Sequence, residues 1–256
     1  MKKGIKLDKK MNKPEKEEII QEDNNKINRY HSSLWYLIIF SILGLIIETL
    51  YCYATTGIWE SRKGLILGPV CPVYGVGALA IILILNKYKG HKVKLFCYGA
   101  IVGSVLEYII SYVLEAMYGT RFWDYSYLKI NLNGRIALEF AIFWGILTWF
   151  IIDIVKPIID KFINKIKGKK RVVLDVLLTV LIVLDIILTV WGINVYKTRA
   201  KKEHEEYVID YEEKEENFIE KIENTLFSNE IMSTIFPNLR YVDKDLNTVW
   251  IKDILK

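Results

Sequence analysis

Two acidic residues lie deep inside long apolar stretches of the sequence, Glu48 and Glu107. A carboxylate in the hydrocarbon region of a bilayer is costly, so it usually faces the interior of a helix bundle and marks a functional site. Two carboxylates whose pKa values are pushed apart can act as an acid and a base. A structural interpretation is equally consistent with the sequence: each carboxyl, protonated, hydrogen-bonds to a neighbouring helix.

Small or polar residues flank both carboxylates at helical spacing. They are Gly44 and Cys52 around Glu48, and Gly99, Gly103 and Ser111 around Glu107, with Glu115 one step further. Residues three or four apart share one face of a helix, and small residues on that face let a second helix approach closely. The spacing therefore predicts that each carboxylate faces a neighbouring helix.

A short polar connection, 121–135, joins two apolar runs and reads RFWDYSYLKINLNGR. Functional loops often carry aromatic, amide and charged groups on a rigid scaffold. Its candidate site residues are Trp123, Asp124, Tyr125, Asn131, Asn133, Gly134 and Arg135. The alternative is an interfacial loop, in which the aromatic residues form a membrane belt and Asn133-Gly134 makes an ordinary turn. Arg135 can pair with Glu139 one turn away, or with Glu48 or Glu107 on other helices.

The stretch 64–77, GLILGPVCPVYGVG, is too rich in Pro and Gly for a regular helix throughout. Broken backbone inside a membrane survives only where protein or water satisfies it, and interrupted helices often form binding sites. The stretch favours a broken or re-entrant segment over a helix that simply starts at Pro69. The backbone-shaping residues are Gly68, Pro69, Pro72 and Gly75, and Cys71 and Tyr74 supply its side-chain chemistry.

Five apolar runs are long enough to cross a bilayer, which takes about 20 residues of helix. They lie near 34–55, 69–86, 95–117, 136–155 and 172–196. The sequence therefore predicts an all-α, polytopic membrane protein with about five transmembrane helices, of which the second is broken or re-entrant. The first run follows some thirty polar residues and is too long for the apolar region of a signal peptide.

Lysine and arginine are distributed unevenly among the connections. Nine precede the first run, and eleven lie in the second and fourth connections against five in the first and third. By the positive-inside rule this predicts a cytoplasmic N-terminus in the cell membrane. Five crossings then place the C-terminal tail outside, although four basic residues at 197–202 follow the last run and argue against that placement.

Composition divides the chain into four parts. We expect a charged, disordered cytoplasmic segment at 1–33, a four-helix membrane domain at 34–156, a basic loop with the fifth helix at 157–196, and an acidic, partly helical tail at 197–256. Asp175, near the basic end of the fifth run, is easily kept hydrated, whereas Asp185, at its centre, needs a partner or a proton. Tyr211, Phe218, Ile222 and Leu226 predict an amphipathic helix in the tail, which we interpret as a small appended domain or a partner-binding segment.

Several functions lack their sequence signals. No phosphate-binding loop G-x-x-x-x-G-K-[ST] is present, so any ATP coupling must come from another chain. The cysteines Cys52, Cys71 and Cys97 lack zinc spacing, and the three histidines form no ligand cluster. We therefore expect no metal and no cofactor. No nucleic-acid module appears, and the net charge of +5 is explained by membrane orientation.

The order of these motifs resembles a known family. A Glu-bearing first helix is followed by GPVCPVYGVG, a VLEY helix, WDYS, and NLNGRI with FWG. This order is similar to the bacterial membrane proteins described as putative ABC-transporter type IV permeases, over residues 34–156. The fifth run and the tail fall outside this resemblance. It implies a permease-like role and singles out the motif residues already named.

We therefore expect a transport component whose partners are the lipid bilayer and a separate ATP-binding subunit or other membrane protein. The alternatives are a membrane-embedded enzyme, with Glu48 and Glu107 acting on an envelope or lipid substrate, and a regulatory scaffold. The expected site is an outward-opening polar vestibule floored by Glu48 and Glu107. The GPVCPVYGVG stretch forms its wall, residues 123–133 form its lid, and Arg135 neutralises one carboxylate or binds an anionic group.

Overall fold

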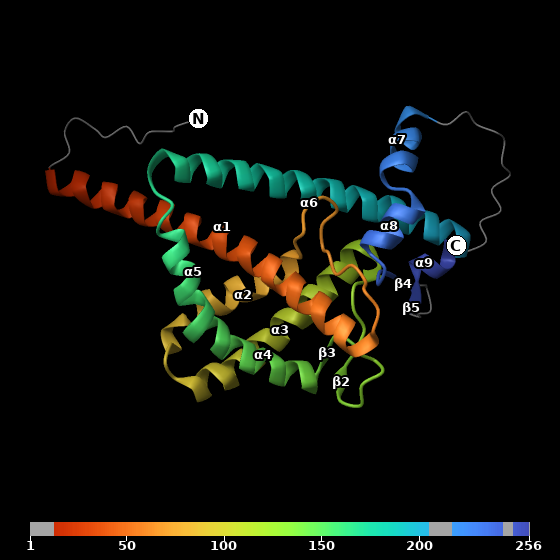
Figure 1. Ribbon diagram of the computed structural model, residues 1–256, viewed down its shortest axis with the longest axis horizontal. Coiled ribbons are helices and arrows are strands. Elements are labelled where there is room, and N and C mark those ends of the chain that lie inside the picture. Colours follow the sequence, from red (N-terminus) through yellow and green to blue (C-terminus); the bar gives the residue numbers. More distant parts are fainter. Residues whose placement is uncertain (1–12, 205–216, 243–247, 256) are drawn as a thin grey trace.

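The computed structural model describes residues 13–204, 217–242 and 248–255 (Figure 1). Its membrane part consists of α1 (Lys13–Thr56), α2 (Pro72–Leu85), α3 (Lys92–Tyr118), α4 (Leu138–Phe150), α5 (Lys156–Ile163) and α6 (Gly168–His204). A short 3-10 turn, η1 (Asn86–Tyr88), follows α2, and a π-helical turn, η2 (Ile151–Val155), joins α4 to α5. The all-α prediction is confirmed.

Four helical stretches are long and apolar enough to cross a membrane: 25–56, 92–117, 138–163 and 168–204. The protein is therefore a multi-pass membrane protein. The second predicted run, 69–86, is helical only from Pro72, with 14 residues in α2. At 1.5 Å per residue α2 spans about 21 Å, less than the roughly 30 Å of a hydrocarbon core. Residues 69–71 of this predicted crossing are irregular, and Asn86 belongs to the 3-10 turn η1.

The N-terminal prediction of a disordered segment at 1–33 is wrong for residues 13–33. These residues are helical and continue without interruption into the apolar part of α1. Their mixed charge does not prevent helix formation, because Lys and Glu are good helix formers.

The segment 57–71 connects α1 to α2 without regular structure, and it runs from the end of α1 back toward the middle of α6 (Figure 1). Asp185 on α6 holds it there. Its carboxylate accepts hydrogen bonds from the backbone N–H groups of Leu67 (3.0 Å) and Gly68 (2.8 Å), and Thr189 accepts one from Ile66. Asp185 was expected to need a partner, and that partner is the backbone of the irregular segment before α2.

Close helix contacts follow the predicted stripes of small residues. A Cβ atom added to Gly99 would collide with Thr148, and one added to Gly103 would lie 2.5 Å from Trp144, so α3 and α4 approach closely along this line. On α1, Gly44 lies against Tyr74 of α2 in the same way. The predicted faces of both carboxylate-bearing helices are therefore confirmed.

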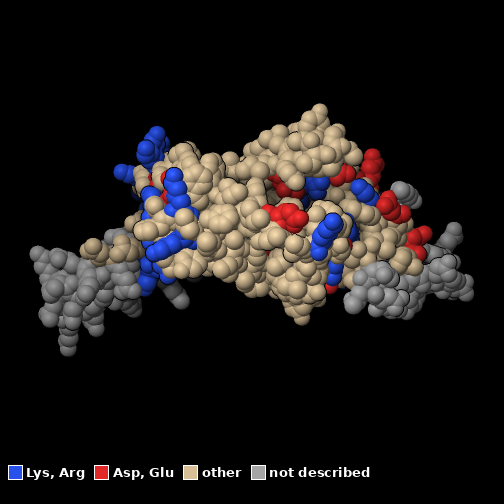
Figure 2. Space-filling view, turned by 90° about the horizontal axis from the view of Figure 1, so that it is seen from below, with Lys and Arg blue, Asp and Glu red and all other residues tan. Residues whose placement is uncertain are grey.

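The bundle has two unlike ends. One, which we call the basic end, holds the connections 86–91 and 164–167, and Lys and Arg side chains form a band around it (Figure 2). An almost uncharged belt follows, and acidic and basic side chains reappear beyond it (Figure 2). The second end, the loop end, carries the segment 57–71, the connection 119–137 and the C-terminal elements (Figure 1).

At the basic end, Asp175 is buried rather than hydrated, which corrects the expectation from its position. It is 5% exposed and bonds to His31 (2.8 Å) and to the indole N–H of Trp35 (3.0 Å), so it joins α6 to α1. The buried pair forms because α1 is already helical at His31, in a segment that was expected to be disordered.

At the loop end, the tail folds back onto the membrane part. It contains α7 (Phe218–Leu226), α8 (Asn229–Ile235), β4 (Arg240–Val242), β5 (Thr248–Trp250) and α9 (Ile251–Ile254). Strand β4 pairs antiparallel with β5 and with β1 (Thr120–Arg121), which follows α3. Phe227, Met232 and Tyr241 pack with Tyr196 of α6 in a shared apolar core. We call residues 217–255 the C-terminal module. The predicted tail helix corresponds to α7, and Tyr211 lies outside the described residues.

Candidate functional site

Glu107 is the centre of a polar cluster inside the bundle. Its side chain is 9% exposed, and its carboxylate accepts hydrogen bonds from the Tyr125 hydroxyl (2.8 Å) and the Trp144 indole N–H (3.0 Å). Helix α3, the connection 119–137 and helix α4 each supply one of these groups. A buried carboxylate with two donors is well satisfied, because hydrogen bonds to charged groups are among the stronger ones.

Glu48 joins the same region from α1. It lies close enough to Tyr74 of α2, to Glu107 and to Tyr125 to interact with each of them electrostatically. We call Glu48, Tyr74, Glu107, Tyr125 and Trp144 the carboxylate cluster. The structure thus places the two carboxylates that the sequence singled out within electrostatic range of each other, with a Tyr side chain near each.

Tyr125 is the residue of the 121–135 connection that reaches into the bundle. Its ring stacks on Phe140 of α4, with 4.3 Å between ring centroids. Burial and the neighbouring Glu107 carboxylate raise the pKa of Tyr125 well above its ordinary value. Tyr125 therefore keeps its proton and serves as a hydrogen-bond donor to Glu107.

Arg62, in the segment 57–71, is a cation within electrostatic range of Glu48, and no motif in the sequence indicated it. Its guanidinium contacts the Cys52 sulfur at 2.7 Å and lies 3.7 Å from Glu60, and it interacts electrostatically with Glu48. The sequence around Arg62 resembles an ordinary solvent-exposed loop. Its position near Glu48 depends on the segment 57–71 folding back against α1, which the sequence does not show. Cys71 also lies near Glu48, and all three cysteines are free thiols.

Arg135 does not join the carboxylate cluster. Its guanidinium bonds to Glu115 (3.0 Å) and Ser111 (3.2 Å) and lies over the rings of Tyr108 and Tyr112. The predicted pairing of Arg135 with Glu48 or Glu107 is therefore not formed. An intrahelical pair with Glu139 is also absent, because α4 begins only at Leu138 and Glu139 is exposed. Glu115 takes Arg135 because both sit at the loop end of the bundle, where Arg121 bonds to the same carboxylate.

Most other residues of the connection shape the loop itself. Strands β2 (Asn131–Leu132) and β3 (Ile136–Ala137) form a hairpin whose turn has positive φ at Asn133 (54°) and Gly134 (66°). Such φ values suit Asn and Gly, as the turn interpretation expected. The Trp123 indole donates to the Arg135 carbonyl, and the Asn131 side chain accepts from the Gly134 N–H. Trp123, Asn131 and Gly134 therefore hold the loop that positions Tyr125.

Asp124 faces the C-terminal module. It accepts from Ser126 within the loop, and its second oxygen pairs with Arg240 of β4 at 2.8 Å. Burial alone would raise the pKa of Asp124, but the hydrogen bonds from Ser126 and the charges of Arg240 and Arg121 hold it below its ordinary value of 3.8. Asp124 is therefore a charged link between the connection 119–137 and the tail.

The predicted backbone residues lie where the broken stretch meets the bundle. Gly68 gives its N–H to Asp185, and Pro72 is the first residue of α2. Gly75 packs against the Leu37 carbonyl and Ser41 of α1, where a side chain would not fit. Pro69 lies in the irregular part of the stretch. Within the described residues, no three His, Cys, Asp or Glu side chains gather as a metal site.

Comparison with known proteins agrees with this architecture. The family model described as Putative ABC-transporter type IV matches residues 35–190, more than half of the chain. The chain belongs to this family. Neither the curated proteins nor the solved structures contain a significant match.

The family match has a transport-related description and is longer than the resemblance read from the motifs. It continues to residue 190, so the expectation that the fifth run falls outside it is wrong. The structure gives a physical reason for including α6 in the domain. Asp185 and Thr189 of α6 bind the backbone that precedes GPVCPVYGVG, so the type IV domain needs this helix to hold its broken stretch.

Proposed function

We propose that this type IV family chain is the membrane-spanning, permease-like subunit of a transport system, and that the carboxylate cluster binds the transported species or a coupling ion. The observation that carries the proposal is that Glu48 and Glu107, from two different helices, lie within electrostatic range of each other inside the bundle. Carboxylates in this position are expensive to keep and commonly mark ion pathways and proton relays.

The cluster favours a proton or another cation over an anion. Two neighbouring carboxylates in a low-dielectric region repel, so both stay ionised only when a cation lies between or beside them. Arg62 is shared with Cys52 and Glu60, and Arg135 is occupied by Glu115. Negative groups therefore outnumber the cations available to them, and uptake of a proton or a small cation relieves the imbalance.

Ligand binding at the cluster can be followed through Trp144, whose indole donates to Glu107. We expect titration of the purified protein with protons, alkali cations or small organic ammonium ions to change its tryptophan fluorescence. Glu48→Gln and Glu107→Gln should abolish the change, because each removes one charge at nearly constant volume. Glu139→Gln is the matched control, since Glu139 is exposed and has no role in the cluster.

Two results would overturn the assignment of the cluster. One is an unchanged titration in both Gln variants, provided that they fold and accumulate normally. The other is turnover of an added lipid by the purified chain alone, lost in the same variants, which would indicate a membrane-embedded enzyme. For the transport role itself, copurification in mild detergent should recover an ATP-binding subunit, because this sequence contains no phosphate-binding loop.

We also propose that the basic end faces the cytoplasm, so that the N-terminus is inside and the loop end is outside. Eleven Lys and Arg residues lie in or beside the two basic-end connections, at 87–94 and 156–171, against five in the two loop-end connections. By the positive-inside rule this bias supports the orientation. In a variant lacking the native cysteines, a Cys at Lys129 should react with an impermeant thiol reagent in intact cells, and a Cys at Lys89 should not. The reverse pattern would contradict this orientation.

A further inference from the structure

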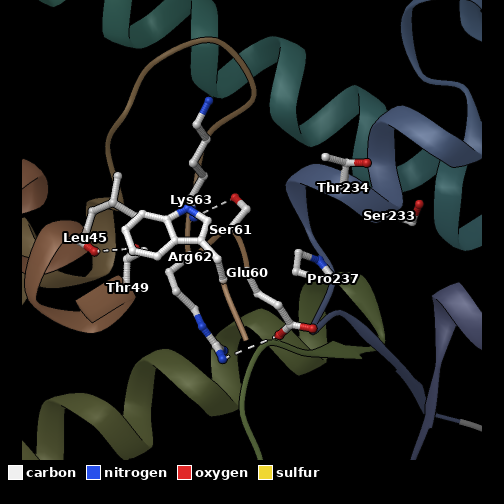
Figure 3. A pocket seen from close by; sticks show the side chains of 10 residues that line it. Leu45, Thr49, Glu60, Ser61, Arg62, Lys63, Ser233, Thr234 and Pro237 are labelled. Atoms are coloured by element: carbon white, nitrogen blue, oxygen red, sulfur yellow. Dashed lines mark hydrogen bonds and ion pairs between the residues drawn. The ribbon is translucent and has the colours of Figure 1, made fainter. Parts of the chain in front are cut away.

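A groove at the loop end lies outside the carboxylate cluster. It has a volume of about 500 Å³ and is formed by three distant parts of the chain (Figure 3). Helix α1 contributes Thr49, the segment 57–71 contributes residues 59–63, and helix α8 contributes Ser233 and Thr234. The groove thus exists only when the C-terminal module, which the family match does not cover, packs against the type IV domain.

Among the charged side chains of the described residues that line the groove, one cation has no ion-pair partner. Glu60 is balanced by Arg62 at 3.7 Å and by Lys252 at 3.5 Å. Lys63 extends away from this pair, toward α6 (Figure 3). It has no ion-pair partner among the described residues, and Ser61, Ser233 and Thr234 also line the groove, with the Ser233 hydroxyl donating to the Glu230 carbonyl. A free ammonium group with several hydroxyls suits an oxygen-rich anion.

The surroundings of the groove are apolar and face outward. Leu50 of α1 is 53% exposed, and Trp59, which lines the groove, is 68% exposed and contacts the ring of Tyr53 edge-on. Exposed aromatic residues at the end of an apolar helix are typical of the membrane interface. A ligand that fits both features has an anionic head for the groove and hydrocarbon for the neighbouring surface of α1.

We propose that the loop-end groove binds the phosphodiester headgroup of an anionic membrane lipid, whose acyl chains lie along the exposed apolar face of α1. Lys63 is the main electrostatic contact, and Thr234 of α8 supplies a hydroxyl from the opposite wall. This proposal is independent of the function proposed for the carboxylate cluster, because none of the cluster residues lines the groove.

The test measures lipid retention by the delipidated full-length protein, using native mass spectrometry with phosphatidylglycerol, with phosphatidylcholine and with free glycerol phosphate. We expect phosphatidylglycerol to bind in preference to phosphatidylcholine. Lys63→Gln should weaken phosphatidylglycerol binding about fivefold, since one basic side chain near an anionic lipid contributes about 1 kcal/mol. Lys129→Gln, which removes an exposed charge at the same end, should leave binding unchanged.

Each remaining outcome decides against the proposal. Equal losses for Lys63→Gln and Lys129→Gln would show non-specific attraction to the positive charge of this end. Binding of glycerol phosphate as tightly as the lipid would assign the groove to soluble phosphates. If Lys63→Gln lowers stability, the double variant Ser233→Ala, Thr234→Val tests the α8 side of the groove instead. Unchanged lipid binding in that variant would exclude a headgroup site between the segment 57–71 and α8.

Discussion

At the scale of single residues, several acidic and basic side chains buried in the described bundle have specific partners. Asp185 accepts two backbone N–H groups, Asp175 pairs with His31, and Arg135 pairs with Glu115. An unpaired charge in a low-dielectric interior costs several kcal/mol, so these partners decide where the segments that carry them can lie. Asp185 in particular fixes a stretch of chain that has no regular hydrogen bonds of its own.

Removing the Asp185 carboxylate should loosen the segment 57–71. In Asp185→Ala the N–H groups of Leu67 and Gly68 lose their acceptor, and we expect a loss of about 2–3 kcal/mol in stability. Asp185→Asn should lose less, because its side-chain oxygen still accepts. Unfolding in mixed detergent micelles measures the stability, and hydrogen exchange at 64–70 locates the change.

Asp153→Ala is the control for this prediction. Asp153 also accepts a backbone N–H, from Gly90, but at an exposed position near the basic end. Its loss should change stability by less than about 0.5 kcal/mol. If Asp185→Ala proves as stable as the unmodified protein, with unchanged exchange at 64–70, then the carboxylate does not hold the segment.

At the scale of helices, small residues set the distances that the carboxylate cluster needs. Gly99 and Gly103 place α3 against Thr148 and Trp144 of α4, and Glu107 follows one turn later on the same face. The contact between Glu107 and Trp144 therefore depends on the absence of side chains at Gly103 and Gly99, one and two turns earlier. Close packing along this face of α3 thus positions the Glu107 carboxylate.

A larger residue at Gly103 should separate α3 from α4. In Gly103→Val the added side chain meets the Trp144 ring, and overpacking of this kind costs about 1–3 kcal/mol. We expect lower stability together with loss of the fluorescence response attributed to Trp144 and Glu107. Ile101→Phe adds volume on the outward face of α3, where Ile101 is 61% exposed, and should preserve both properties. An unperturbed Gly103→Val variant would contradict this account of the interface.

At the scale of the whole molecule, the C-terminal module connects the parts of the loop end. Strand β4 pairs with β1, Arg240 bonds to Asp124, and Arg199 of α6 donates to the Phe227 carbonyl. The connection 119–137 that carries Tyr125 is therefore held from both sides, by the bundle and by the module. Movement of the module would be transmitted to the loop through these contacts.

Acid should weaken the attachment of the module. The pKa of Asp124 is lower in the folded protein than its ordinary value of 3.8, so its contribution to stability is complete above that value and is lost as the pH falls through the folded pKa. Limited proteolysis between pH 6 and pH 3 should show the module released at the lower pH.

The variant Asp124→Asn should release the module more readily at pH 6 and remove the part of the pH dependence due to Asp124. Glu230→Gln, at an exposed acidic site within the module, tests whether any lost carboxylate has the same effect, and an equal effect would reject the special role of Asp124.

The sequence alone determined the membrane class, the helix faces and the two carboxylates. These follow from local rules, since apolar length specifies a crossing and a four-residue spacing places side chains on one face whatever lies opposite. It also indicated that the 64–77 stretch is broken, because Pro and Gly limit the backbone there directly. The same local rules explain why Asn133 and Gly134 could be recognised as a turn.

Only the tertiary structure decided which charged groups meet. Arg135 was equally compatible with Glu48, Glu107 and Glu139, and the fold gave it Glu115 because both lie at the loop end. Arg62 comes within electrostatic range of Glu48 only because the segment 57–71 folds back, and Asp185, more than a hundred residues further along the chain, holds that segment. Ion pairs act over a few ångströms in space, so their partners are fixed by how the helices and connections pack, and the spacing of residues along the chain does not specify that.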